Sequence, residues 1–250
     1  MLSISIVTKT HDRLPMLLEC IKSVQNLKCE PYEQLIQWEH VIYDDGSHDG
    51  TQLHFAKHTY PNTRYIRSDE NRGIATAANA AIKTCTSDFI FELDSDDIVP
   101  QRFLTNIYDT SQEYPDTDWF VADLYRTDSN LRYMVGNDYY GWKQYSSCNE
   151  ILSAIFSSTH FIQHNVVYKR ALWERAGRYD ETLTMAEDLD LYIRFLLGGH
   201  MPKYVPYISH FHRFHAGNAS IGIDAERHKK DVILLAAKYH DKLIERGITP

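Results

Sequence analysis

The sequence places three carboxylates within four positions, at Asp94-Ser95-Asp96-Asp97. Like charges at this spacing raise one another's energy unless a cation neutralises them. Carboxylate oxygens are preferred ligands of hard divalent cations such as Mn²⁺ and Mg²⁺, which can also hold the phosphates of a substrate. The quartet is therefore typical of a divalent metal site that binds a diphosphate, and it is equally typical of a solvated acidic turn before a helix near Pro100.

Two further segments combine charge with glycine. Asp44 and Asp45 end an apolar run and are followed by Gly46, and an aspartate there could accept the N3–H of a uracil ring. Arg72 and Gly73 precede an alanine-rich run, and the N-terminus of a helix beside a fixed positive charge favours the binding of anions. Taken alone, each segment is also typical of an ordinary turn or a capped helix.

A fourth acidic position lies later in the chain, at Glu187-Asp188. The apolar residues Leu189, Ile193 and Leu196 follow at helical spacing, so Asp188 can point from the start of a helix into a cleft if they pack inward. A carboxylate in that place can act as a general base toward an incoming hydroxyl. Acidic residues in a first helical turn also complement the helix dipole, which is the alternative interpretation.

Three histidines and an arginine lie close together in the sequence, at His210, His212, Arg213 and His215. On an alternating strand His210 and His212 face the same way. We find no cysteine or carboxylate at a spacing that would complete a zinc site with them. The segment instead favours an Arg213 or His215 that faces a phosphate, with His215 in contact with the same metal as the acidic quartet.

The elements that must position these residues alternate between strand and helix. Apolar runs predict strands at 3–8, 40–43, 63–66, 89–93 and 119–125, and helical spacing predicts a helix from residue 14 and helices at 51–58 and 73–83. This alternation predicts a mostly parallel sheet with helices on both faces. The acidic clusters of this half follow the carboxyl ends of predicted strands, which is where open α/β sheets bind ligands.

The later part of the chain is expected to be extended at 161–168 and 200–215, and helical at 170–176, 187–197 and 225–246. We find no repeat, low-complexity tract or linker, so the sequence predicts one domain over residues 1–250. Within this domain we expect a donor-binding half at 1–125 and an acceptor half with a C-terminal helix at 126–250.

The composition excludes several classes of protein. The chain of 250 residues is 43% hydrophobic and 24% charged, with a net charge of −8, which argues against nucleic acid as a partner. Its four cysteines show no C-x-x-C spacing, which excludes a zinc ribbon and favours free thiols in a reducing compartment. With neither a signal peptide nor 18 consecutive apolar residues, we expect a cytoplasmic protein without a transmembrane segment, able to dock on the inner face of a membrane.

Taken in order, five segments resemble the inverting family 2 glycosyltransferases, which have the GT-A fold. The first strand and turn are similar to the family's Ser-Ile-Val-x-Pro-Thr-Tyr-Asn-Arg. The second segment matches its Asp-Asp-Gly-Ser-x-Asp-Gly-Thr almost letter for letter, and the last resembles the acceptor-side block that ends in Glu-Asp. The five segments are residues 5–13, 44–51, 71–79, 93–97 and 167–188.

The resemblance implies a single α/β domain of the GT-A type and a role for each matching residue. Asp188 would deprotonate the acceptor hydroxyl for in-line attack at the anomeric carbon, which inverts that carbon. A divalent cation, Mn²⁺ or Mg²⁺, would lie at Asp96 and Asp97, with His215 as a further ligand, and would stabilise the departing diphosphate. The residues implied to bind the nucleotide-sugar donor are Thr10, Asp44, Asp45, Arg72, Asp94 and Asp96.

The resemblance also implies the substrates. A UDP-sugar is the donor expected from the family, and the acceptor is expected to be a hydroxyl of a glycan or a lipid-linked glycan. Tyr139, Tyr140 and Trp142 could form an aromatic platform for that acceptor, or pack in an ordinary way. Lys9 stands where the family has proline and His11 where it has an aromatic residue, which bears on how the nucleoside is held.

Two other functions are weighed against this one. A catalytically inactive nucleotide-sugar-binding partner within a glycan-assembly complex would keep the fold, although the intact Asp96, Asp97 and Asp188 argue against it. A nucleotidyltransferase that makes the sugar nucleotide would carry a glycine-rich basic loop after the first strand, and residues 8–13 contain no glycine.

Overall fold

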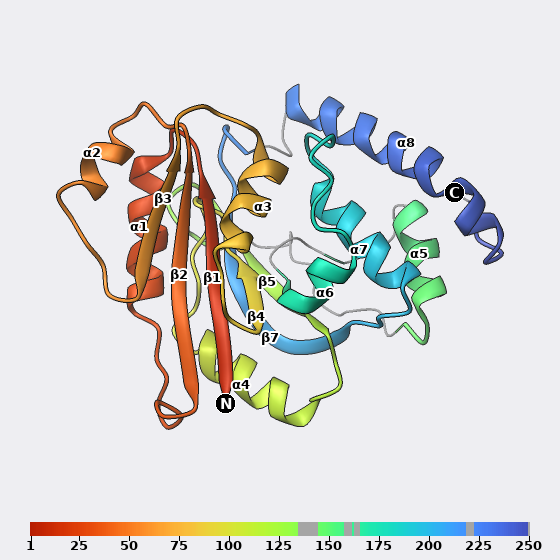
Figure 1. The fold of residues 1–250 in the computed structure, drawn as a ribbon, viewed down its shortest axis with the longest axis horizontal. Helices are drawn as coiled ribbons and strands as arrows, with labels where there is room; N and C mark the ends of the chain where they lie inside the picture. The colour runs from red at the N-terminus through yellow and green to blue at the C-terminus, as the bar shows by residue number, and fades with distance from the viewer. Residues whose placement is uncertain (135–144, 158–161, 163–165, 219–222, 250) are drawn as a thin grey trace.

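The computed structural model describes residues 1–134, 145–157, 162, 166–218 and 223–249. Over these residues the strands form one seven-stranded sheet in the order β3-β2-β1-β4-β6-β5-β7 (Figure 1). The four strands of the first part pair in parallel, as the predicted alternation requires. They are β1 (Leu2–Thr10), β2 (Ile36–Asp45), β3 (Thr63–Ser68) and β4 (Phe89–Glu92).

The second part of the sheet mixes the two pairing directions. Strand β6 (Val167–Lys169) runs antiparallel to both β4 and β5, whereas β5 (Trp119–Thr127) pairs in parallel with β7 (Lys203–Arg213). The extended run expected at 161–168 lies partly outside the described residues, and its end forms the start of β6. The predicted mostly parallel α/β fold is confirmed, with one strand reversed.

Six of the helices lie where helical spacing predicts them. They are α1 (Leu14–Gln25), α2 (Thr51–Phe55), α3 (Ile74–Lys83), α6 (Arg170–Arg175), α7 (Glu187–Leu197) and α8 (Ile223–Ile244).

Helix α4 (Phe103–Glu113) is the helix near Pro100 that the alternative interpretation of the acidic quartet named, whereas α5 (Cys148–Phe156) was not expected. A sequence signal for α5 does exist. Its N-cap residue Ser147 accepts a hydrogen bond from the Glu150 N–H at 3.2 Å, and Glu150 in turn accepts one from the Ser146 N–H at 2.7 Å. A serine followed three residues later by glutamate is a known mark of a helix start.

The core lies on both faces of the sheet. Ile6 and Val7 are neighbours in β1, both are fully buried, and they belong to separate apolar clusters because successive strand residues point to opposite faces. The cluster with Ile6 packs against α1 and α4, and the cluster with Val7 packs against α3, α5, α6, α7 and α8. Figure 1 shows α3 and α5–α8 gathered on one side of the strands. Strands buried on both faces are expected of a parallel sheet.

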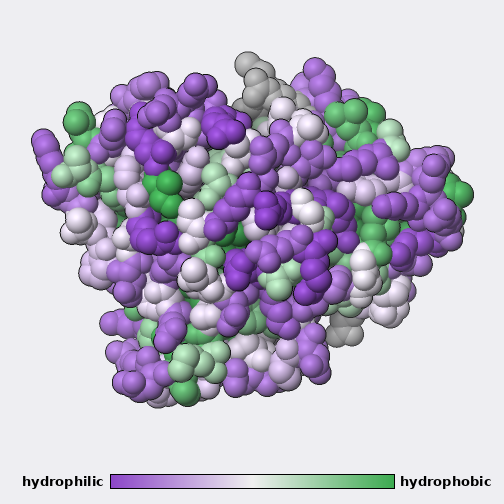
Figure 2. Space-filling model, viewed as in Figure 1, coloured by the Kyte–Doolittle hydropathy of each residue, from purple (hydrophilic) through white to green (hydrophobic). Residues whose placement is uncertain are grey.

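The surface is mostly hydrophilic on the face drawn in Figure 2, with an apolar patch along α8 at the upper right. Ile233 and Leu234 of that helix are exposed. No helix within the described ranges has both the length and the apolar character needed to cross a membrane. All four cysteines are free thiols, as expected, and Cys20 and Cys85 are buried.

Candidate active site

A cleft with a volume of about 400 Å³ lies where the parallel strands end. Residues from the ends of β1, β2 and β4 line one side of it, and the first turn of α7 lines the other. The sequence-predicted site residues that the structure brings together there are Thr10, Asp45, Asp94, Asp96 and Asp188. The carboxylates that were expected to contact the donor therefore share one cavity with Asp188, the expected base.

Asp45, the last residue of β2, both lines the cleft and holds the start of α3. Its carboxylate accepts hydrogen bonds from the backbone N–H groups of Arg72 at 3.0 Å and Gly73 at 2.9 Å. The next residue, Gly46, has a φ of +78°, and a Cβ there would lie 2.6 Å from the carbonyl carbon of Glu70. Glycine is therefore required at this turn, because any side chain would collide with backbone.

Two of the expected donor-binding side chains lie outside the cleft lining. Asp44 is completely buried beneath it, where its carboxylate accepts hydrogen bonds from the Ser47 N–H at 2.8 Å and from the Tyr65 hydroxyl. The Arg67 guanidinium lies 3.6 Å from the same carboxylate. Arg72 contributes its backbone N–H to Asp45, while the residue itself is exposed. Asp44 thus supports the loop after β2 from below.

Thr10, at the end of β1, carries a polar atom suited to a ligand. Its hydroxyl is buried, lines the cleft and has no hydrogen-bond partner among the residues that the structure describes. A buried polar atom without a partner is unfavourable, so a ligand that supplied one would be stabilised there. The neighbouring His11, which replaces the family's aromatic residue, links the two strand ends through Nδ1 and the Asp45 carbonyl oxygen at 2.9 Å.

The acidic quartet follows β4, and the side chains of Asp96 and Asp97 within it face different surroundings. Asp96 faces the cleft, with its Oδ2 atom 2.7 Å from Nη1 of Arg13 and 2.9 Å from Nε2 of His215. Burial raises the pKa of Asp96 above its ordinary value, and the neighbouring Asp94 and Asp97 carboxylates add to the effect. The structure therefore brings His215 to Asp96.

Asp97 turns away from the cleft toward β7. Its Oδ1 atom accepts a hydrogen bond from the Arg213 N–H at 2.9 Å, and its Oδ2 atom lies 3.3 Å from Nδ1 of His212 and 3.8 Å from Nε2 of His210. His210 and His212 do face the same way, as the strand alternation predicts. The expectation that they lack a carboxylate partner is wrong, since Asp97 and His212 meet across 115 positions of sequence.

The groups around Asp96 fit a divalent cation by their donor chemistry. The carboxylates of Asp94 and Asp96 and the imidazole of His215 are oxygen and nitrogen donors of the kind that Mn²⁺ accepts. Burial first, and the neighbouring Asp94 and Asp97 carboxylates second, raise the pKa of Asp96, and a bound cation would offset both effects. Asp97, which was expected to share this metal, faces the two histidines of β7 instead.

Asp188 occupies the first turn of α7, as expected. Leu189, Ile193 and Leu196 are buried, so the partly exposed Asp188 side chain is left on the cleft side of the helix. Its Oδ1 atom accepts a hydrogen bond from the Leu189 N–H at 2.6 Å. The helix therefore begins at the cleft with a carboxylate held by its own first turn.

The segment before α7 is held by a residue that sequence reasoning missed. Asp231 of α8 is buried, and its Oδ2 atom accepts hydrogen bonds from the N–H groups of Thr184 and Met185, each at 2.7 Å, and from the Ala186 N–H at 3.4 Å. No local pattern reveals this contact, because 45 to 47 positions separate the partners.

Asn79 of α3 makes a second connection across the cleft that the sequence did not show. It donates to the Tyr179 carbonyl oxygen and accepts from the Tyr179 N–H, both at 3.0 Å, and it donates to Glu181 at 2.8 Å. This side chain joins α3 to the loop that leads to α7.

The floor of the cleft contains a buried ion pair built around Lys9. Its Nζ atom lies 2.6 Å from Oε2 of Glu92. Burial lowers the pKa of Lys9, but Glu92 and Asp94 outweigh it and the net pKa is raised. Glu187 lines the same floor, where burial first and the Asp188 carboxylate second raise its pKa to about 8. Glu187 Oε2 has no hydrogen-bond partner within the described part of the chain.

The expected aromatic platform of Tyr139, Tyr140 and Trp142 lies outside the described residues.

Comparison with solved structures identifies the fold. S. aureus TarS 1-349, solved in complex with UDP-GlcNAc, matches with a TM-score of 0.73 at 18% identity, over 94% of this chain and 66% of that one. The mannosyltransferase PcManGT from Pyrobaculum calidifontis, solved with GDP-Man and Mn²⁺, matches with a TM-score of 0.67 at 16% identity, over 95% and 64%. These likenesses show that the chain has the GT-A fold.

The sequence comparisons then give the family. A model of glycosyl transferase family 2 matches residues 5–176, and the chain belongs to that family. Chondroitin synthase of Escherichia coli is 28% identical over 239 residues, which cover 92% of this chain and 32% of the synthase. The uncharacterized glycosyltransferase YwdF of Bacillus subtilis is 27% identical over 253 residues, which cover 98% of this chain and 84% of that protein. This chain thus spans about a third of the synthase.

Proposed function

We propose that the protein is a metal-dependent, inverting glycosyltransferase. It moves a sugar from a nucleoside diphosphate donor, with UDP as the nucleotide, to a hydroxyl of a glycan or a lipid-linked glycan. The observation that carries the proposal is that Asp188 and the carboxylates of Asp45, Asp94 and Asp96 line one cleft. Family membership supports the reaction class, and TarS, which was solved with UDP-GlcNAc, supports the donor.

The donor is held by the strand ends. The unpartnered hydroxyl of Thr10 and the carboxylate of Asp45 contact the nucleoside, and the positive charge of Arg72 lies near it. Asp94, Asp96 and His215 would hold a divalent cation, which when bound would supply a Lewis acid for the departing diphosphate. Residues 1–125 then form the donor half of one domain and residues 126–250 the acceptor half.

The transfer itself needs a base on the side of the cleft opposite the strand ends. Asp188 accepts the proton of the acceptor hydroxyl while the hydroxyl oxygen bonds to the anomeric carbon. The bond between that carbon and the diphosphate oxygen breaks in the same step, so the nucleoside diphosphate leaves with the electron pair. Attack from the face opposite the leaving group inverts the carbon, without a covalent sugar–enzyme intermediate.

The base is tested by Asp188→Asn, with Asp241→Asn on the exposed face of α8 as the matched control. Nucleotide release from a panel of UDP-sugars with Mn²⁺ should fall by about 10²- to 10⁴-fold in Asp188→Asn and stay unchanged in the control. Binding of UDP by calorimetry should remain in both. Near wild-type turnover in Asp188→Asn would remove Asp188 from this role.

The same panel separates this function from the alternative of an inactive binding partner. Transfer or slow hydrolysis of any donor by the wild-type protein supports the enzyme. Tight UDP binding without turnover for every donor, with a glycan acceptor present, supports the binding partner instead. We place the reaction in the cytoplasm, at the inner face of the membrane when the acceptor is lipid-linked.

A further inference from the structure

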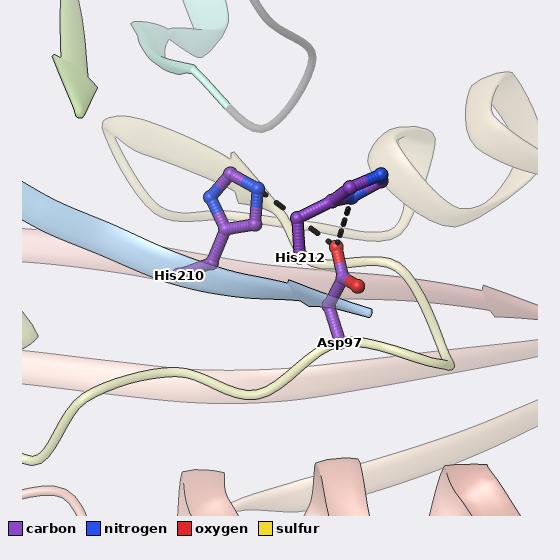
Figure 3. Close-up of side chains that lie close together, drawn as sticks. All are labelled: Asp97, His210 and His212. Atoms are coloured by element: carbon purple, nitrogen blue, oxygen red, sulfur yellow. Dashed lines mark hydrogen bonds and ion pairs between the residues drawn. The ribbon is translucent and has the colours of Figure 1, made fainter. Parts of the chain in front are cut away.

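A second group of metal-ligating side chains lies next to the proposed donor metal site. His210 and His212 of β7 and Asp97 of the loop after β4 point toward one another (Figure 3). One ligand atom from each residue lies within 4.8 Å of the other two. Two imidazoles with one carboxylate form a common ligand set of zinc sites that keep an open fourth position.

The distances in this group suit a long hydrogen bond between Asp97 and His212, and they also suit ligands of one metal ion. Asp97 Oδ2 lies 3.3 Å from His212 Nδ1 and 3.8 Å from His210 Nε2, whereas an N–H···O hydrogen bond is most often about 2.9 Å long. Zinc bonds of about 2.0–2.1 Å at tetrahedral angles place neighbouring ligand atoms about 3.3–3.4 Å apart.

The surroundings orient these ligands. Ser209 Oγ lies 2.8 Å from Nδ1 of His210, which turns Nε2 of that ring toward Asp97. The Arg213 N–H donates to Oδ1 of Asp97 at 2.9 Å, which turns Oδ2 toward the histidines. Partners of this kind on the outer atoms of metal ligands fix their geometry and their tautomers.

The group is separate from the donor metal site and is reached through the cleft. Asp96 pairs with His215 and Arg13, and Asp97 with the histidines of β7, although the two aspartates are adjacent in sequence. The side chains of Asp97 and His210 are only 1% exposed. The His212 side chain is 14% exposed and lines the cleft, so the cleft offers an ion both a path and a solvent ligand.

We propose that Asp97, His210 and His212 bind a divalent transition metal, with Zn²⁺ as the preferred ion, at a second site distinct from that of Asp96 and His215. The bound ion joins the loop after β4 to the end of β7. It thereby fixes the main chain that carries Asp96 on one side and His215 on the other. Free energy of binding at such a site adds to the stability of the fold.

The first experiment counts tightly bound zinc. The protein is stripped with a chelator, dialysed against Zn²⁺ and analysed by elemental mass spectrometry as wild type, His212→Gln, Asp96→Asn and the exposed control His240→Gln. We expect His212→Gln to hold one equivalent less than wild type, and Asp96→Asn and His240→Gln to retain the equivalent that His212→Gln loses. Equal zinc content in wild type and His212→Gln would leave only a hydrogen bond between His212 and Asp97 and would overturn the proposal.

Thermal unfolding gives a readout independent of activity. Zinc at a hundredfold excess over its Kd should raise the Tm of wild type by about 5–10 °C. Most of this rise should persist in Asp96→Asn and disappear in His212→Gln. A rise of equal size in His212→Gln and wild type would place the stabilising ion elsewhere.

A second variant covers the case in which His212→Gln fails to fold. His212→Cys replaces one zinc ligand with another and should retain the metal. With Co²⁺ as the probe, its thiolate should add a sulfur-to-cobalt charge-transfer band that wild type lacks, at one equivalent of added metal. A folded His212→Cys protein that binds cobalt without this band would refute ligation at position 212.

Discussion

The two sides of the cleft are held in place by different means. On the donor side, the carboxylates lie at the ends of paired strands. Backbone N–H groups of the loops after β2 and β3 hold Asp44 and Asp45 there, and the side chains of Arg13 and His215 hold Asp96. On the base side, the segment before α7 depends on Asp231 of α8. The loop at Tyr179 is fixed by Asn79, which is 100 positions away in sequence.

The difference shows where the site is vulnerable. The sheet itself defines the donor side, since β1, β2 and β4 are paired in parallel along their lengths. The position of Asp188 instead depends on a few polar side chains from other elements. Substitutions far from the cleft should therefore displace the base more readily than the nucleotide contacts.

The largest effect we expect concerns the buried acid next to the base. Glu187 has a pKa of about 8, raised by burial and by Asp188, and it faces Lys9 and Glu92 across the cleft floor. Between its ordinary pKa and 8, the folded protein keeps a proton that the unfolded chain releases, so stability falls as pH rises through this range. Each unit by which the pKa is shifted in the folded state corresponds to about 1.4 kcal/mol of unfolding free energy.

Glu187→Gln should remove this loss, because the amide resembles the neutral acid. Urea unfolding from pH 5 to pH 8 should show a falling free energy of unfolding for wild type and a flatter curve for the variant. The two proteins should be alike at pH 5 and the variant more stable at pH 8. Parallel curves would mean that Glu187 ionises with an ordinary pKa and does not lower the free energy of unfolding at high pH.

The next largest effect tests the dependence on α8. Asp231→Ala leaves the N–H groups of Thr184 and Met185 without their carboxylate acceptor, which should lower the free energy of unfolding by about 2–3 kcal/mol. With the start of α7 released, kcat should fall while the Kd for UDP stays near that of wild type. Asp241→Asn, on the exposed face of the same helix, should change neither quantity.

Urea unfolding, initial rates and calorimetry measure these quantities. If Asp231→Ala weakened UDP binding as much as it lowered kcat, the two sides of the cleft would not be held independently, and the comparison would fail.

The smallest effect we expect comes from the N-cap of α5, a local contact that belongs to neither side of the cleft. Ser147→Ala removes the side-chain cap of α5 and should lower the free energy of unfolding by about 1 kcal/mol. Because α5 lies away from the cleft lining, kcat and the KM for the donor should be unchanged. A matched set of melts and initial rates decides this, and a change in kcat would connect α5 to the position of the base.

The sequence predicts the donor side well for a physical reason. Each apolar run there is a strand of the parallel sheet, and the polar residues that follow it must emerge at one edge, which places Thr10, Asp45 and Asp96 together. The reversed strand β6 was not predictable in the same way, because periodicity reports burial and not direction. Helix α5 was missed although Ser147 and Glu150 mark its start.

The base side shows what sequence patterns leave out. The helical spacing after Asp188 was enough to place that residue at the cleft. The contacts that hold it were not readable, because Asp231 and Asn79 reach their partners through the folded chain and not through spacing. For the same reason His210 and His212 appeared to lack the carboxylate that Asp97 provides.

The parallel pairing of β5 with β7 has a consequence for how the molecule assembles. Strand β7 is the last strand in the chain and pairs with β5, whereas β1 to β4 all come from the first 92 residues, although β1 and β4 pair across a separation just as long. During synthesis the first part can therefore begin to fold while the later strands are still being made, as segments emerge N-terminal first. Because β7 is the last strand to be made, we expect its pairing with β5 to be the step that completes the sheet. The part of the cleft at the ends of β1, β2 and β4 would then fold early, and Asp188 would reach its position in the last folding step.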